Sequence, residues 1–207
     1  MTTLTQGNDG FLWIGTQDGL NRYDGSEFVS YHYNPKDTNS LCGNEVNRLF
    51  TDSQGRIWIG TVNHGLCFYS PVDDKFVRVY SDKDSLSGLS VTAIISDIAE
   101  DHMGRIWIAP LDEGLYSMVP SAKHSNRHSI LPFSDSKTIG KEITSILVTN
   151  NQELILGNKS GALYIVNLES DHEHFKFQIL DFMSTYVVIE SERVFYTLID
   201  IYYSRHL

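Results

Sequence analysis

The sequence has few of the features on which most enzymes and nucleic-acid-binding proteins depend. Its 207 residues carry 16 Lys and Arg against 26 Asp and Glu, a formal net charge of −10 at pH 7. Binding to nucleic acid phosphates needs a basic surface, so nucleic acid is not an expected partner. The chain also lacks Gly-x-Gly-x-x-Gly, a phosphate-binding loop, Gly-x-Ser-x-Gly and His-Glu-x-x-His. We therefore expect a non-catalytic protein without a cofactor.

Long apolar runs are absent as well. No segment approaches the roughly 18 to 20 apolar residues that a membrane-spanning helix needs. The first residues, Met1–Thr5, have neither the basic start nor the apolar centre of a signal peptide. The sequence therefore predicts no leader and no membrane span within this chain.

Cysteine is scarce, and histidine is not arranged for metal binding. Cys42 and Cys67 are too few for a disulfide framework. Cys67 lies in the middle of an expected strand, which favours a small core residue, and a disulfide with Cys42 is the alternative. Two pairs of closely spaced histidines lie in two polar stretches that we interpret as exposed loops, so we expect no bound metal. They are His124, His128, His172 and His174.

What the chain does have is an internal repeat centred on tryptophan. Trp13, Trp58 and Trp107 stand 45 and 49 residues apart, and a weaker copy places Ile155 a further 48 residues on. A repeat of this length, built of short β segments and glycine turns, predicts propeller blades. Each blade buries its faces against its neighbours, so the tryptophans are expected to be structural. The four copies are Asp9–Thr16, Gln54–Thr61, Met103–Ala109 and Gln152–Gly157.

The second copy shows the strands of one blade most clearly. Val46–Thr51 alternates apolar and polar residues as a strand does, and a turn at Asp52–Gly55 follows. Three further strands are expected at Arg56–Thr61, Gly65–Tyr69 and Phe76–Tyr80. The turn and its strand resemble the Asp-box of sialidases, a turn far from their chemistry, so we interpret it as structure. In the other copies, strands are expected at Gly19–Tyr23, Phe28–Tyr33, Val91–Ile94, Gly114–Met118, Ile143–Leu147, Gly161–Ile165 and Phe175–Leu180.

The repeat divides the chain into blades. We place them at residues 1–35, with a first strand that is cut short, and at 36–81, 82–135 and 136–180. Residues 181–207 are interpreted as a partial fifth blade or a divergent tail, because neither glycine nor proline follows Gly161. The fold class expected is all-β, with about four blades of four antiparallel strands.

These motifs resemble a known family. Trp-Ile-Gly-Thr, followed by Gly-Leu, an aromatic residue and an Asp or Gly turn, resembles the two-component regulator propeller repeat. The segments Asp37–Val46 and Ser85–Val91 resemble the Ser-Leu-Ser-x-Asn-x-Val start of a new blade in that family, with Ser90 where Asn44 stands. The resemblance extends over roughly residues 4–168.

The resemblance implies the extracytoplasmic sensor part of hybrid histidine kinases, common in gut Bacteroidetes, that detect polysaccharide fragments. In that family two seven-bladed propellers are usually followed by an immunoglobulin-like domain, a membrane span and the kinase. With four blades and no kinase sequence, the chain is interpreted as a fragment of a longer sensor or a truncated reading frame. We expect an incomplete open arc of a seven-bladed propeller, periplasmic in its membrane-anchored parent.

Any function of such a fold has to come from loops. Loops that join the second and third strands of each blade emerge on one face near the propeller axis, where ligands generally bind. In this sequence they carry acids, an amide and an imidazole, groups that can hydrogen-bond sugar hydroxyls. The expected ligand-binding residues are Asp18, Asn63, His64, Asp112 and Glu113.

Three classes of function follow. The favoured one is a sensor module that binds an oligosaccharide or another small periplasmic ligand. Its other expected partners are the missing blades, the neighbouring domains of the parent sensor and a second copy in a homodimer. The second is a protein-interaction propeller, which needs no small-molecule pocket. The third is a propeller lyase or glycosidase, for which Asp18, His64, Asp112 and Glu113 are the available acids and bases.

Overall fold

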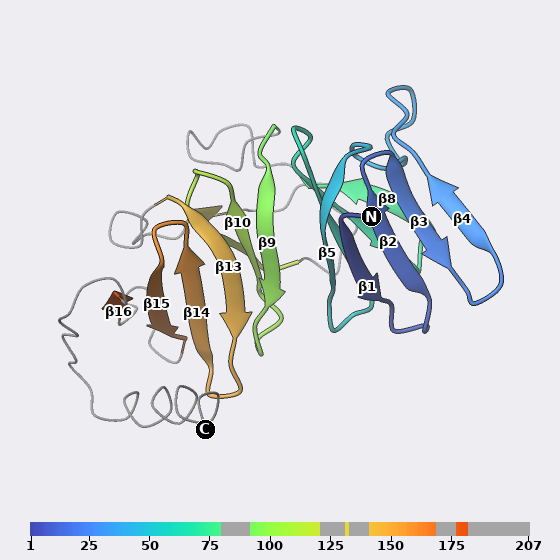
Figure 1. Cartoon of the computed structure of the whole chain (residues 1–207). Coiled ribbons are helices and arrows are strands. Elements are labelled where there is room, and N and C mark those ends of the chain that lie inside the picture. Colours follow the sequence, from blue (N-terminus) through green and yellow to red (C-terminus); the bar gives the residue numbers. More distant parts are fainter. Residues whose placement is uncertain (80–91, 121–130, 133–140, 169–176, 182–207) are drawn as a thin grey trace, which may run out of the picture.

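The computed structural model describes residues 1–79, 92–120, 131–132, 141–168 and 177–181, the last five and residues 131–132 by their backbone (Figure 1). Within these ranges the chain forms sixteen strands and no helix. The strands make four antiparallel sheets of four strands each, and in every sheet the strands follow one another in chain order. Four consecutive four-stranded blades confirm the predicted all-β class.

The strands of the first two sheets are short and evenly spaced. The first sheet contains β1 (Thr3–Gln6), β2 (Leu12–Thr16), β3 (Gly19–Tyr23) and β4 (Phe28–Tyr31). The second contains β5 (Val46–Thr51), β6 (Ile57–Thr61), β7 (Leu66–Ser70) and β8 (Lys75–Arg78).

The other two sheets repeat this arrangement. The third contains β9 (Ile95–Glu100), β10 (Ile106–Pro110), β11 (Tyr116–Met118) and β12 (Leu131–Pro132). The fourth contains β13 (Ile143–Val148), β14 (Glu153–Asn158), β15 (Ala162–Asn167) and β16 (Phe177–Asp181).

The four sheets stand side by side as an open arc. Strands β1, β5, β9 and β13, the first of each sheet, contact one another in that order. The first and fourth sheets lie at opposite ends of the row in Figure 1. The open arc predicted from the sequence is therefore what the structure shows.

Some strand boundaries differ from the prediction. The third blade was expected to begin with Val91–Ile94, but β9 begins at Ile95, which pairs with Pro110 at a bulge in the ladder. Strand β11 begins at Tyr116 instead of Gly114, because Gly114 has φ of +95° and belongs to the preceding loop. The predictions for His124, His128, His172, His174 and residues 182–207 lie outside the described residues.

Tryptophan burial between blades forms the core. Trp13, Trp58 and Trp107 are each exposed by 1% or less. Each belongs to a cluster that also contains the apolar residues flanking the tryptophan position of the next blade. The flanking pairs are Ile57 with Ile59, Ile106 with Ile108, and Leu154 with Leu156. The structural role expected for the tryptophans is therefore confirmed.

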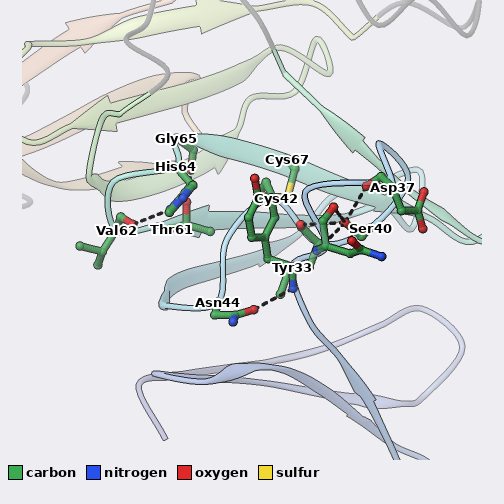
Figure 2. Close-up of a disulfide and its surroundings, with 12 residues drawn as sticks. Tyr33, Asp37, Ser40, Cys42, Asn44, Thr61, Val62, His64, Gly65 and Cys67 are labelled. Carbon is green, nitrogen blue, oxygen red and sulfur yellow. Dashed lines mark hydrogen bonds between the residues drawn. A yellow bond between two sulfur atoms is a disulfide. The ribbon is translucent and has the colours of Figure 1, made fainter.

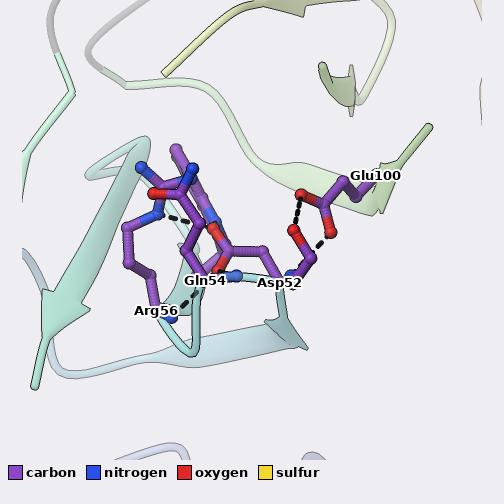
Figure 3. Close-up of polar contacts among 6 residues, drawn as sticks. Asp52, Gln54, Arg56 and Glu100 are labelled. Carbon is purple, nitrogen blue, oxygen red and sulfur yellow. Dashed lines mark hydrogen bonds and ion pairs between the residues drawn. The ribbon is translucent and has the colours of Figure 1, made fainter. Parts of the chain in front are cut away.

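A buried carboxylate orients the tryptophan in the second blade (Figure 3). Oδ1 of Asp52 accepts hydrogen bonds from the backbone N–H groups of Gln54 (3.0 Å) and Arg56 (2.9 Å). Its Oδ2 accepts from Nε of Arg56 at 2.6 Å and from the indole Nε1 of Trp58 at 2.7 Å. Four donors satisfy this carboxylate, which offsets the cost of burying its charge. The turn is thereby locked to the strand that follows it.

The third blade has the same buried aspartate, whereas the first and fourth blades have Gly7 and Thr149 at the equivalent position. Asp101 accepts from the backbone of Met103 and Arg105 and from the Trp107 indole at 3.0 Å. The equivalent residue in the first blade is Gly7, and Nε1 of Trp13 is buried without a hydrogen-bond partner among the described residues. The tryptophan burial is therefore common to three blades, whereas the carboxylate is not.

Polar contacts also tie the second blade to the third. The backbone N–H and Oγ of Ser53 donate to the carboxylate of Glu100 in β9, both at 2.7 Å (Figure 3). Arg48 in β5 pairs with Asp97 in β9 at 3.1 Å. Asp97 in turn accepts from the backbone N–H of Ile146 in β13 at 2.8 Å. These contacts fix the position of each blade along its neighbour.

Glycine two residues after the tryptophan lets the next blade approach closely. A Cβ at Gly60 would lie 2.7 Å from Cβ of Ile95, the first residue of β9, so no side chain fits there without a shift. Gly157 holds the equivalent place in the fourth blade, and its nearest neighbour would be Cβ of Ser145 at 3.7 Å. The glycine is thus a requirement of blade contact at Gly60 and not at Gly157.

We predict that Asp52→Ala lowers the free energy of unfolding by about 3–5 kcal/mol, because it leaves the Arg56 guanidinium buried without its counter-ion. Asp9→Ala is the matched control, since exposed Asp9 accepts one backbone hydrogen bond at 3.1 Å and should contribute about 0.5–1 kcal/mol. Urea unfolding followed by tryptophan fluorescence measures both. Equal losses at the two positions would contradict a special role for the buried carboxylate.

We also predict opposite effects for two equivalent glycine substitutions. Gly60→Ala should cost about 1–3 kcal/mol, because its methyl group overpacks against Ile95. Gly157→Ala should be neutral or stabilising by about 0.4–1 kcal/mol, because alanine restricts the unfolded chain and meets only ordinary contacts. Paired denaturation curves give the comparison. A Gly60→Ala protein as stable as the parent would show that the blades are not in close contact there.

Candidate functional site

The five predicted ligand-binding residues all lie in loops between the second and third strands of their blades. Asp18 lies between β2 and β3, Asn63 and His64 between β6 and β7, and Asp112 and Glu113 between β10 and β11. All are exposed except Glu113, which is half-buried. The residues therefore occupy equivalent loops of three consecutive blades.

The sequence folds these loops tightly for identifiable reasons. Asn63 and Asp112 have φ of 66° and 60°, in the left-handed region that Asn and Asp tolerate better than most residues. In the first two blades the threonine of the Trp-Ile-Gly-Thr cassette closes the loop. Oγ1 of Thr61 donates to the carbonyl of Gly65 at 2.9 Å, and Thr16 makes the same bond in the first blade. The cassette thus fixes both the blade and its loop.

The segment joining the first blade to the second is anchored beneath the loop of the second (Figure 2). The side-chain oxygen of Asn44 accepts from the backbone N–H of Tyr33 at 2.7 Å. The backbone N–H of Val62 donates to the carbonyl of Glu45 at 2.9 Å. A Cβ on Gly43 would lie 2.8 Å from Cβ of His64, so the His64 side chain rests directly on this segment.

A disulfide joins the same two parts, which corrects one expectation from the sequence. Cys42 and Cys67 are bonded, with their Cα atoms 6.1 Å apart (Figure 2). Cys67 is fully buried in β7, as expected of a core residue, but it is not a free thiol. The bond forms because the joining segment crosses over β7, a path that strand periodicity does not reveal.

These parts enclose a hollow of about 330 Å³. It lies where the joining segment, the β6–β7 loop, the end of β8 and the start of the third blade meet. Its polar and aromatic lining comes from Tyr33, Asn63, His64, Arg78 and Thr92. Of the five predicted residues, Asn63 and His64 line this hollow, whereas Asp18, Asp112 and Glu113 do not. A single funnel shared by all five stays a prediction.

Three polar or aromatic residues of the hollow, Tyr33, Arg78 and Thr92, were not predicted from the sequence. The ring centroids of Tyr33 and His64 are 5.5 Å apart at an interplanar angle of 45°. The guanidinium carbon of Arg78 lies 5.2 Å from the centre of the Tyr33 ring, within cation–π range. Tyr33 and Arg78 are 45 positions apart along the chain and lie outside the predicted loops. No sequence pattern indicated that they would meet.

A second hollow, of about 480 Å³, lies between the outer strands of the first two blades. Tyr31, Tyr69, Asp74 and Arg22 are among its lining residues, and none of the five predicted residues is. The hydroxyl of Tyr69 donates to Oδ1 of Asp74 at 2.6 Å. Burial, together with this hydrogen bond to Asp74, raises the pKa of Tyr69. We interpret this hollow as part of the packing between the two blades.

Two further features are absent from the described part of the chain. Among the described residues, no group of three or more His, Cys, Asp and Glu side chains is placed to hold a metal ion. The described part of the chain contains no helix long and apolar enough to cross a membrane.

Comparison with known proteins agrees with this architecture. Residues 40–63, which include the last part of the joining segment and the β6–β7 loop up to Asn63, match the family model described as two component regulator propeller. A segment of 38 residues is 47% identical to histidine kinase P4 of Formosa agariphila. That segment is 18% of this chain and 3% of the kinase.

Solved structures with the same fold cover more of the chain. The extracellular domain of BT3049, a proposed hybrid two component system from B. thetaiotaomicron, superimposes with a TM-score of 0.70 at 23% identity. The alignment covers 87% of this chain and 24% of that one. The extracellular domain of BT4673 from the same organism superimposes with a TM-score of 0.66 at 20% identity, and the alignment covers 80% of this chain and 23% of that one. This chain therefore spans about a quarter of the length of these sensor domains.

Proposed function

We propose that this chain, which belongs to the two component regulator propeller family, is a non-catalytic sensing module that binds an oligosaccharide. It would act in the extracytoplasmic, periplasmic region of a membrane-anchored two-component sensor. The similarity to the extracellular domain of a hybrid two component system supports the sensor role. The observation that carries the ligand class is the hollow lined by Tyr33, Asn63, His64 and Arg78.

The lining suits a sugar. Small-molecule sites combine apolar or aromatic walls with a few well-placed polar groups. Here the rings of Tyr33 and His64 offer flat surfaces, while the Asn63 amide and the Thr92 hydroxyl can exchange hydrogen bonds with ring hydroxyls. The backbone of Tyr33 is fixed by Asn44, and the His64 side chain rests on Gly43. Fixing these positions lowers the entropy lost on binding.

The same lining argues against glycoside hydrolysis in this hollow. Glycosidases use a pair of carboxylates that flank the scissile bond. No Asp or Glu is among the described residues that line the hollow. The ligand would therefore be held and not hydrolysed, and it would signal only through different affinities for two states of the sensor.

We predict that His64→Ala weakens binding of a glycan by about tenfold or more, because it removes one wall of the hollow and a hydrogen-bonding group. The ligand is first found on an array of neutral and acidic oligosaccharides, and affinities are then measured by calorimetry. Asp112→Ala tests whether the neighbouring loop reaches the same ligand, and it should weaken binding as well.

The matched control is His32→Ala, since His32 is exposed and lines the other hollow. Its affinity should equal that of the parent chain. Unchanged affinity at both His64 and Asp112 would place the ligand site elsewhere, most plainly in further blades of the sensor.

The outer face of the first blade supports a second part of the proposal, that another blade of the parent sensor packs there. Leu4 is 52% exposed, whereas the equivalent Leu49, Ile98 and Ile146 of the later blades are exposed by 9% or less. The register defines the equivalence, because each pairs with the residue after the tryptophan position. In those blades the preceding blade covers the side chain. An uncovered face of this kind favours association.

We predict that the isolated chain self-associates through this face, forming a dimer or larger oligomers at micromolar concentration. The double substitution Leu4→Ser and Phe28→Ser should shift it to monomer in light scattering, because both side chains are exposed on the uncovered blade. Val72→Ser is the control, since Val72 is 89% exposed in the turn between β7 and β8. A parent chain that is already monomeric would contradict the proposal.

A further inference from the structure

Within the described ranges, Arg78, the last residue of β8, has buried guanidinium donors without hydrogen-bond partners. Its Nε and Nη2 atoms are buried, and neither has a hydrogen-bond partner among the described residues. The face of its guanidinium lies over the Tyr33 ring at 5.2 Å, which compensates part of the charge. The ring cannot accept the in-plane hydrogen bonds that Nε and Nη2 donate. Leaving buried donors of a charged group unpaired costs more than leaving neutral ones.

The blade itself does not require an arginine at this position. Arg78 pairs with Cys67 across the β7–β8 ladder. The corresponding residues in the other blades are Ser30, Pro132 and Ile179, which pair with Asn21, Tyr116 and Tyr164. The cation is therefore peculiar to the second blade, the blade whose loop and joining segment enclose the hollow. Arg78 buries donors with no partner among the described residues, at a position where the other blades have no charge, and this points to a role in binding.

The two unpaired atoms have the geometry of an anion site. Nε and Nη2 lie on the same side of the guanidinium and donate two parallel hydrogen bonds, the arrangement that recognises a carboxylate or a sulfate. Because these atoms are buried, an anion entering the hollow would meet them after a rotation of the guanidinium. Since the chain has a net charge of −10, its overall field does not attract anions, and recognition has to be local.

We propose that the hollow binds a sugar carrying an oxyanion, a carboxylate or a sulfate group, with Arg78 as the anion-binding residue. The sugar ring would lie against His64 and Tyr33, and Asn63 and Thr92 would bond its hydroxyls. This inference rests on the proposed function and specifies its ligand class.

The test compares three disaccharides titrated into the 207-residue chain by calorimetry. Digalacturonic acid supplies the carboxylate, a 6-sulfated N-acetyllactosamine supplies the sulfate, and neutral galactobiose has neither. We expect at least one charged disaccharide to bind at least tenfold more tightly than galactobiose, and the charged one that binds better identifies the source of the anion. Arg78→Met should abolish this preference and leave galactobiose binding unchanged.

Two further variants separate binding from structure. Arg22→Met removes an arginine that also lies over aromatic rings, but in the other hollow, and it should leave all three affinities unchanged. Arg78→Lys keeps the charge without the paired donors and should retain only part of the preference. This variant decides the question if Arg78→Met fails to fold, as judged by near-ultraviolet circular dichroism.

The outcomes are distinct. Equal affinity for charged and neutral disaccharides overturns the anion inference and leaves oligosaccharide binding intact. A preference that survives in Arg78→Met, or in Arg78→Lys at full strength, overturns the role of Arg78. If none of the three disaccharides binds, nor any glycan on the array, the proposed function fails and this inference fails with it.

Discussion

The structure depends on one repeated contact, the burial of a tryptophan of one blade against the second strand of the next. A single blade leaves both faces of its sheet apolar, and only neighbouring blades can cover them. The contact recurs for Trp13, Trp58 and Trp107, and in two of the three a buried aspartate holds the indole N–H. Where Gly7 replaces that aspartate, burial alone keeps the ring in place. Hydrophobic packing therefore determines the position of the tryptophan ring between the blades, and the carboxylate adds a hydrogen bond to its indole N–H in two of them.

The same contact decides where loops can gather. Close approach at Gly60 brings β9 against β6 and sets consecutive blades side by side. The loops after β2, β6 and β10 then stand in equivalent places. What distinguishes the second blade is the segment that precedes it, which is bonded to β7 by Cys42 and Cys67 and supports His64 through Gly43. The hollow is a product of this crossing and not of the repeat.

The sequence predicted the features that arise from the repeat, and it did not predict those that arise from the path of the joining segment. Strand periodicity, glycine turns and the tryptophan interval are local signals, and they predicted the blades and the loops of Asn63 and His64. The open arc is what the resemblance to a seven-bladed family implies for four blades. Tyr33 and Arg78 meet through the path of the joining segment, which has no periodicity to read. For the same reason, strand position favours a free core cysteine at Cys67 over the disulfide that the structure contains. Strand β9 begins later than expected because a bulge at Pro110 sets its register.

In a repeat protein, residues shared by equivalent positions can be distinguished from residues found in one blade alone. Residues that recur at equivalent positions, such as the three tryptophans and the glycines at Gly15 and Gly60, are explained by contact between blades. Residues that depart from the repeat carry information that packing does not require. Arg78 is such a residue, since Ser30 fills the same place in the first blade without a charge. Its Nε and Nη2 atoms, unpaired within the part of the chain that the structure describes, have an energetic cost that the contact with the Tyr33 ring offsets only in part, which is why the anion is proposed to bind there.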